Sequence, residues 1–206
     1  MPQSCGLTLV RRFSSRPEIM KFFRKKKEVS IKHFAVKSIS NLLNDDLDIT
    51  LIDPEEVLST AERKLVINLS KPFGIAALFR ATLKEIETRK LTISGEALVQ
   101  HFVAGIYLTY RDNQVSALEK TTEETFERVQ QFLHSATEIA PDDPYTKATV
   151  ESVFGTVFAR DVLPDCDIRQ PVLQRKFATV LYFAMTFSES LNKDVHAFFA
   201  KFIVTD

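Results

Sequence analysis

The four histidines are the residues of this chain best suited to hold a metal ion, but their spacing argues against a metal site. Four different expected helices carry them: His33, His101, His134 and His196. No HxxH or HExxH pair joins any two of them. His134 and Glu138 are four residues apart, which puts two ligand types on one helical face, but a di-iron site would need two Glu-x-x-His motifs and further carboxylates. We therefore predict no metal site and interpret His134 and Glu138 as a surface pair.

A second candidate is the acidic loop expected between the first two helices. Oxygen-bearing side chains occupy its first, third, fifth, seventh and twelfth positions, as in an EF-hand loop: Asn44, Asp46, Asp48, Thr50 and Glu55. The turn of such a loop needs glycine at the sixth position, where the chain has Ile49, and Pro54 precedes the glutamate that would bind calcium with both oxygens. The sequence thus favours a loop that ends one helix and starts the next.

Cys166 is the candidate nucleophile of the chain. Asp165 and Asp167 flank it, and their negative charges should raise the pKa of the thiol and weaken its reactivity. The sequence has no glycine-rich phosphate loop, no Gly-x-Ser-x-Gly motif and no Walker-type lysine. We predict no catalytic residue and no cofactor, although an enzyme whose polar residues converge only in three dimensions stays open.

Charge divides the chain at about residue 27. The first 27 residues carry eight basic side chains and one acidic side chain, whereas the remaining 179 carry 19 basic and 26 acidic ones. We expect residues 1–27 to form a basic leader and residues 28–206 to form a single domain. Because an acidic body repels phosphate, nucleic acid is not an expected partner.

Three hypotheses account for the leader. The stretch Arg11 to Ser15 resembles a mitochondrial processing site, which would place the body in the mitochondrial matrix. We favour a cytoplasmic protein that starts at Met20, because Pro2 and Pro17 leave little room for a presequence helix. The third hypothesis is a weak contact with a membrane surface through two apolar and four basic residues: Phe22, Phe23, Arg24, Lys25, Lys26 and Lys27. No stretch of the body reaches the ~20 apolar residues of a membrane-spanning helix.

Hydrophobic periodicity predicts an all-α fold, a globular bundle of about eight helices. The expected helices cover residues 31–43, 53–69, 72–89, 95–111, 115–136, 143–158, 173–185 and 195–203. Asp53 should be the N-cap of the second, with Glu56 closing a capping box, and Ser94 should cap the fourth. The helix at 95–111 is apolar around most of its circumference, so we expect it in the centre. Apart from a weak hint at Ile49 to Ile52, we find no strand pattern.

Phenylalanine is the last feature with a functional implication. Six of the 17 phenylalanines fall within 26 residues near the C-terminus: Phe177, Phe183, Phe187, Phe198, Phe199 and Phe202. Such a surplus fits a central helix, a dimer interface or the wall of an apolar pocket. We therefore predict a non-catalytic interaction or regulatory protein that binds a protein partner or a second copy of itself. The alternative is a helical protein that binds a small molecule or lipid in a Phe-lined pocket.

Overall fold

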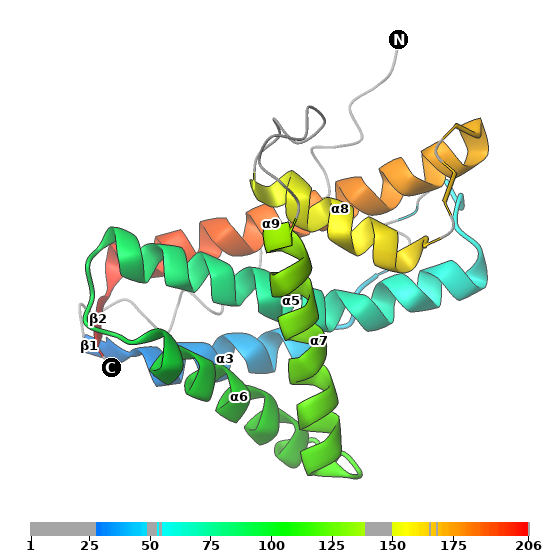
Figure 1. Cartoon of the computed structure of the whole chain (residues 1–206). Coiled ribbons are helices and arrows are strands. Elements are labelled where there is room, and N and C mark those ends of the chain that lie inside the picture. Colours follow the sequence, from blue (N-terminus) through cyan, green and yellow to red (C-terminus); the bar gives the residue numbers. More distant parts are fainter. Residues whose placement is uncertain are drawn as a thin grey trace.

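The computed structural model describes residues 28–48, 53, 55–138, 150–164, 166–167 and 169–205. Within these residues two short strands and six helices follow one another along the chain (Figure 1): β1 (Glu28–Ser30), α3 (Ile31–Asn44), α5 (Thr60–Thr88), α6 (Gly95–Asp112), α7 (Leu118–Glu138), α8 (Val150–Val162), α9 (Pro171–Lys201) and β2 (Ile203–Thr205). The all-α class is confirmed. The expectation of eight helices is not, because two pairs of expected helices are each one continuous helix.

Helix α5 joins the expected helices at 53–69 and 72–89 and runs through Pro72. A proline inside a helix removes a backbone hydrogen bond and costs about 3 kcal/mol. The helix continues because every residue from Pro72 to Leu78 is buried, so packing in the core outweighs the local cost. Pro72 therefore marks a tightly packed part of the helix and not its start.

The start of α5 also differs from the prediction. Ser59 is the N-cap, and it forms a capping box with Glu62: the Ser59 hydroxyl accepts from the Glu62 N–H, and the Glu62 carboxylate accepts from the Ser59 N–H. Asp53, the expected N-cap, lies in the preceding loop, where it accepts hydrogen bonds from the N–H groups of Val57 and Leu58. The carboxylate of Asp53 thus holds the loop that leads into the helix.

Helix α9 joins the expected helices at 173–185 and 195–203 into one helix that starts with a proline at its first turn. The polar stretch between the two apolar stripes stays helical because α9 packs along its length against α5 and α8. The helix ends at Lys201, and Ile203, expected in its last turn, belongs to β2.

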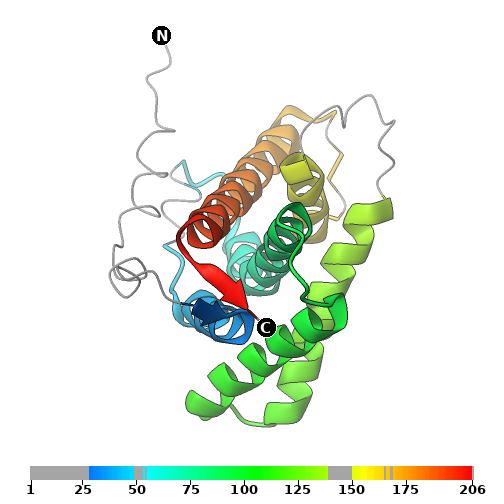
Figure 2. The same ribbon diagram turned by 90° about the vertical axis from the view of Figure 1, so that its left-hand side faces the viewer.

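Helix α5 lies in the centre of the fold, where it packs against the five other helices (Figure 2). It runs parallel to α9, since Glu62 pairs with Lys176 near the helix starts and Glu85 pairs with His196 near the helix ends. The prediction that residues 95–111 form the central helix is therefore wrong. Helix α6 packs mainly between α3 and α7, and Tyr107 on its outer side is 38 % exposed.

The two strands, which the sequence analysis missed, join the two ends of the described chain. They pair in parallel, with Glu28 opposite Ile203, Val29 opposite Val204 and Ser30 opposite Thr205. Three residues are too few to show an alternating pattern, and the pairing joins segments more than 170 residues apart. Residues Ile49 to Ile52, where the sequence weakly indicated a strand, lie outside the described residues. The expected helix start at Asp143 and Pro144 lies outside them as well.

Candidate functional site

A cluster of aromatic rings fills the middle of the fold around Phe73 of α5. Phe73 is fully buried, and four rings from three other helices surround it. The ring centroids lie 4.7 Å away for Phe158, 5.6 Å for Phe132, 5.9 Å for Phe154 and 6.4 Å for Phe187. Distances of this size are those of rings in direct contact, so α5, α7, α8 and α9 meet in a closed aromatic core.

The six phenylalanines singled out from the sequence divide between this core and a second cluster. Phe183 and Phe187 stack on each other at 5.6 Å within the first. Phe198 and Phe199 pack against Phe34 of α3, with centroids 4.3 and 5.9 Å away, and Phe202 packs on Phe198 at 4.9 Å. Four of these five rings belong to α9 and the fifth, Phe202, directly follows it. All five residues are at most 8 % exposed, while Phe177 is only partly buried. Five of the six phenylalanines are thus buried inside the fold of a single chain.

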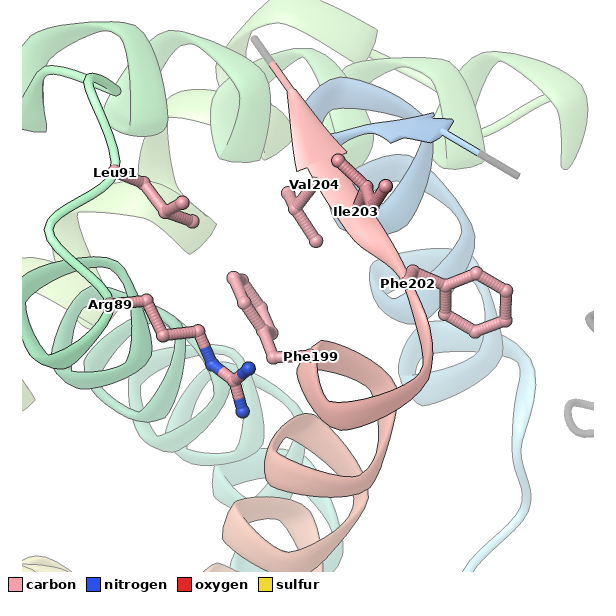
Figure 3. Close-up of a pocket in the computed structure, with 6 residues that line it drawn as sticks. All are labelled: Arg89, Leu91, Phe199, Phe202, Ile203 and Val204. Atoms are coloured by element: carbon pink, nitrogen blue, oxygen red, sulfur yellow. The ribbon is translucent and has the colours of Figure 1, made fainter. Parts of the chain in front are cut away.

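A hollow opens beside the second cluster, where the end of α5 meets the end of α9. Its volume is about 220 Å³, and six residues line it: Arg89, Leu91, Phe199, Phe202, Ile203 and Val204. Figure 3 shows the side chains of Leu91, Phe199 and Val204 around one space, with Arg89 at its edge, while the ring of Phe202 points away from that space. The wall is therefore apolar with a single cation.

Arg89 belongs to a group of three charged or titratable side chains at this end of the molecule. Its Nε donates to Glu85 Oε2 at 2.8 Å, and the other Glu85 oxygen lies 2.7 Å from His196 Nδ1. Burial raises the pKa of Glu85, but the contacts with His196 and Arg89 outweigh it and hold the pKa below its ordinary value. Glu85 is therefore ionised at neutral pH and fixes the position of the guanidinium.

The guanidinium of Arg89 has further donors. Its Cζ lies 5.9 Å from the centroid of the Phe199 ring, so the cation also stands over an aromatic face. Among the described residues, its two terminal amino groups donate to no side chain and no carbonyl. One nitrogen of Arg89 thus holds the side chain in place, and two remain for a ligand.

A second charged group lies at the other end of the α5–α9 pair. Lys176 Nζ is 2.8 Å from both oxygens of Glu62, which is also the capping residue of α5. Cys166 lies nearby and donates through its Sγ to the carbonyl of Leu173 at 3.3 Å. Burial, with the charges of Asp167 and Glu62, raises the pKa of the Cys166 thiol. The predicted direction is confirmed for Asp167, with burial as the larger cause, while Asp165 lies outside the described residues.

The histidines do not come together. His33 and His134 are exposed, His101 is half-buried, and His196 pairs with Glu85. Within the described ranges, no group of three or more His, Cys, Asp or Glu side chains is arranged to hold a metal ion.

In the described part of the loop after α3, no group of acidic side chains is arranged to hold a metal ion. Asn44 bonds to Ser40 and accepts from Asn113 at 2.7 Å, while Glu55 pairs with Arg175 of α9. Residues 49–52 and 54 of this loop lie outside the described part of the chain. The same is true of the leader residues named for membrane contact, Phe22 to Lys27.

Comparison of the chain with protein-family models, with curated proteins and with solved structures found no match. Over the described residues, no helix has both the length and the apolar character needed to cross a membrane.

Of the six residues around the hollow, only Phe199 and Phe202 were candidates on the sequence alone. Arg89 and Leu91 sit at the end of α5 and just after it, where an arginine ordinarily complements the helix dipole. Val204 belongs to a strand with no sequence signal. The cation of Arg89 lies beside an apolar wall because segments 89–91 and 199–204 pack together in the tertiary structure.

Proposed function

We propose that this chain is a non-catalytic helical binding protein whose main partner is another protein. The observation that supports this proposal is the exposed apolar surface of α9. Val172 is 67 % exposed and Tyr182 is 53 % exposed, although the opposite side of the same helix is buried in the core. Ten residues separate them, so they project within about 80° of each other on the helix. Tyrosine on a helix face is typical of protein interfaces, since the ring packs and the hydroxyl bonds.

In this proposal the contact surface centres on Tyr182 and not on the six phenylalanines, five of which are buried. A matched pair of variants tests it: Tyr182→Ser on α9 and Tyr107→Ser on α6, both at exposed tyrosines. The proposal expects Tyr182→Ser to abolish binding of a protein captured by the wild-type chain, while Tyr107→Ser leaves it unchanged. Equal binding by wild type and both variants would contradict the role of α9. Native mass spectrometry of the purified chain reports self-association in the same experiment.

We further propose that residues 1–27 are a leader and that the folded body is cytoplasmic. The pairing of Glu28 in β1 with Ile203 in β2 supports a body that includes residue 28, since it ties that residue to the segment that follows the last helix. The N-terminal residue of the protein isolated from its own cells tests the compartment. A start at Met20 or Lys21 supports the cytoplasm, and a start at Ser14 or Ser15 supports import into mitochondria.

The hollow beside Arg89 favours a second candidate function, the binding of a small molecule. Its wall is apolar and includes Phe199, as the Phe-lined pocket hypothesis requires. Its volume of about 220 Å³ lies below the ~300–1,000 Å³ usual for drug-sized ligands, so the ligand would be small. Amide NMR titrations with added apolar compounds test this function, and a chain in which none of them shifts the signals of the residues around the hollow contradicts it.

A further inference from the structure

We propose that the hollow at the joint end of α5 and α9 binds a small carboxylate with an apolar body, and that Arg89 receives the carboxylate group. The inference rests on the second candidate function, to which it adds the chemical class of the ligand and the residue that selects it. It follows from three properties of the hollow: its size, its wall and the unused donors of its one cation.

Size limits the body of the ligand. A dry apolar cavity of about 150 Å³ is large enough to hold benzene. The hollow measures about 220 Å³, which leaves room for one ring or a short branched chain together with a carboxylate. Leu91, Phe199 and Val204 surround this space with hydrocarbon, so the buried part of the ligand must itself be apolar (Figure 3).

The positive charge of Arg89 determines which polar group the ligand carries at the mouth of the hollow. Because Glu85 takes only the Nε of Arg89, the two terminal amino groups can form the parallel pair of hydrogen bonds that a carboxylate accepts. The bond to Glu85 also fixes the side chain before the ligand arrives, which reduces the entropy lost on binding. Arg89 would then bridge two carboxylates, that of Glu85 and that of the ligand. A cationic ligand would meet the guanidinium and be repelled.

The test uses the full chain and three probes of the same shape: benzoate, benzyl alcohol and benzylamine. Titrations followed by two-dimensional amide NMR report both the affinity and the place of binding. Benzoate should shift the amide signals of Leu91, Phe199 and Val204 with a Kd in the millimolar range, as expected for so few atoms. Benzyl alcohol should bind about 10- to 100-fold more weakly, because charge-assisted hydrogen bonds are lost. Benzylamine should not bind.

Two variants separate the role of Arg89 from that of the hollow. Arg89→Gln should weaken benzoate binding about 10- to 100-fold and leave benzyl alcohol binding unchanged, which also shows that the hollow remains folded. Arg175→Gln, at the far end of α9, removes one positive charge away from the hollow and should change neither affinity. Leu91→Trp should abolish binding of both probes by filling the space.

The outcomes distinguish the inference from the function on which it rests. Equal affinities for benzoate and benzyl alcohol in the wild-type chain would overturn the assignment of a carboxylate, while small-molecule binding would stand. Shifts by benzoate that Arg89→Gln leaves intact would overturn the role of Arg89. If none of the three probes shifts the amides of the hollow, both the inference and the second candidate function fail.

Discussion

The replacement of Gly105 by alanine tests how closely the helices of this fold approach one another. Gly105 lies in the middle of α6, where that helix packs on α3. A Cβ atom added there would stand 2.8 Å from Ile39 Cδ1 and 3.2 Å from the Cα atom of Val36. The first neighbour is the end of a flexible side chain, but the second is backbone. One of the two helices must therefore shift to admit a single methyl group.

Two opposing effects determine how much Gly105→Ala changes the free energy of unfolding. Alanine in place of glycine stabilises an unhindered helix by about 1 kcal/mol. Forcing extra atoms into a packed interface costs about 1–3 kcal/mol. Because the Val36 contact involves backbone, we expect the upper part of that range and a net loss of about 1–2 kcal/mol in the free energy of unfolding. In a domain of this size each kcal/mol lowers the melting temperature by about 2–4 °C.

Urea unfolding followed by circular dichroism measures this difference directly. Gly95→Ala is the matched control, because nothing lies within 4 Å of a Cβ added at Gly95 in the first turn of the same helix. It should stabilise the protein by up to about 1 kcal/mol. Combining Gly105→Ala with Ile39→Val should recover only part of the loss, since the contact with Val36 remains. If Gly105→Ala is as stabilising as Gly95→Ala, the close packing of α3 on α6 is refuted.

Three further variants test other parts of the structure. Phe73→Ala should lower the free energy of unfolding by about 3–5 kcal/mol in urea titrations, because it removes the ring at the centre of the aromatic core. Asp53→Asn should cost about 2–3 kcal/mol, because the buried carboxylate accepts from Val57, Leu58 and Arg63, and one oxygen becomes an amide donor that faces them. Glu85→Gln should flatten the pH dependence of the melting temperature at acid pH. Since the fold holds the pKa of Glu85 below its ordinary value, the ionised group stabilises the protein above about pH 4.5, and this stability is lost as the pH falls through the lowered pKa.

Each of these expectations has a contrary result. A Phe73→Ala protein as stable as the wild type would mean that the rings do not pack around that position. An Asp53→Asn protein of unchanged stability would mean that the carboxylate does not hold the loop before α5. Melting temperatures that fall equally with acid in the wild type and in Glu85→Gln would remove Glu85 as a source of the pH dependence.

Local signals in the sequence were reliable where local contacts decide the structure. Ser94 was expected to cap α6, and its hydroxyl accepts from the N–H of Ala97. The start of α3 at Ile31 and its end near Asn44 also follow the predicted boundaries closely. Caps and periodic apolar stripes act within one or two turns of helix, so the sequence alone carries them.

Pro72 and Asp53 show where local signals failed. Both carry strong helix-start preferences, yet Pro72 lies inside α5 and Asp53 lies in a loop. In each case an interaction outside the local sequence pattern outweighed the helix-start preference. For Pro72 it is the burial of Pro72 to Leu78 in the core, and for Asp53 it is the bond from Arg63 to its carboxylate. The free energy of burial exceeds the few kcal/mol of a helix propensity, which is why the helices expected at 53–69 and 72–89 form one helix.

Some features of the candidate site follow from the sequence, and others follow only from the tertiary structure. The sequence by itself determined the helical class and the abundance of phenylalanine from which the core and the wall of the hollow are built. Only the tertiary structure decided which rings fill the core and which line the hollow. It also brought Arg89 and Leu91 from the end of α5 to Phe199 and Val204 from the end of the chain. Contacts between residues more than 100 positions apart leave no periodic trace along the chain, because they depend on how complete helices pack and not on any one helix.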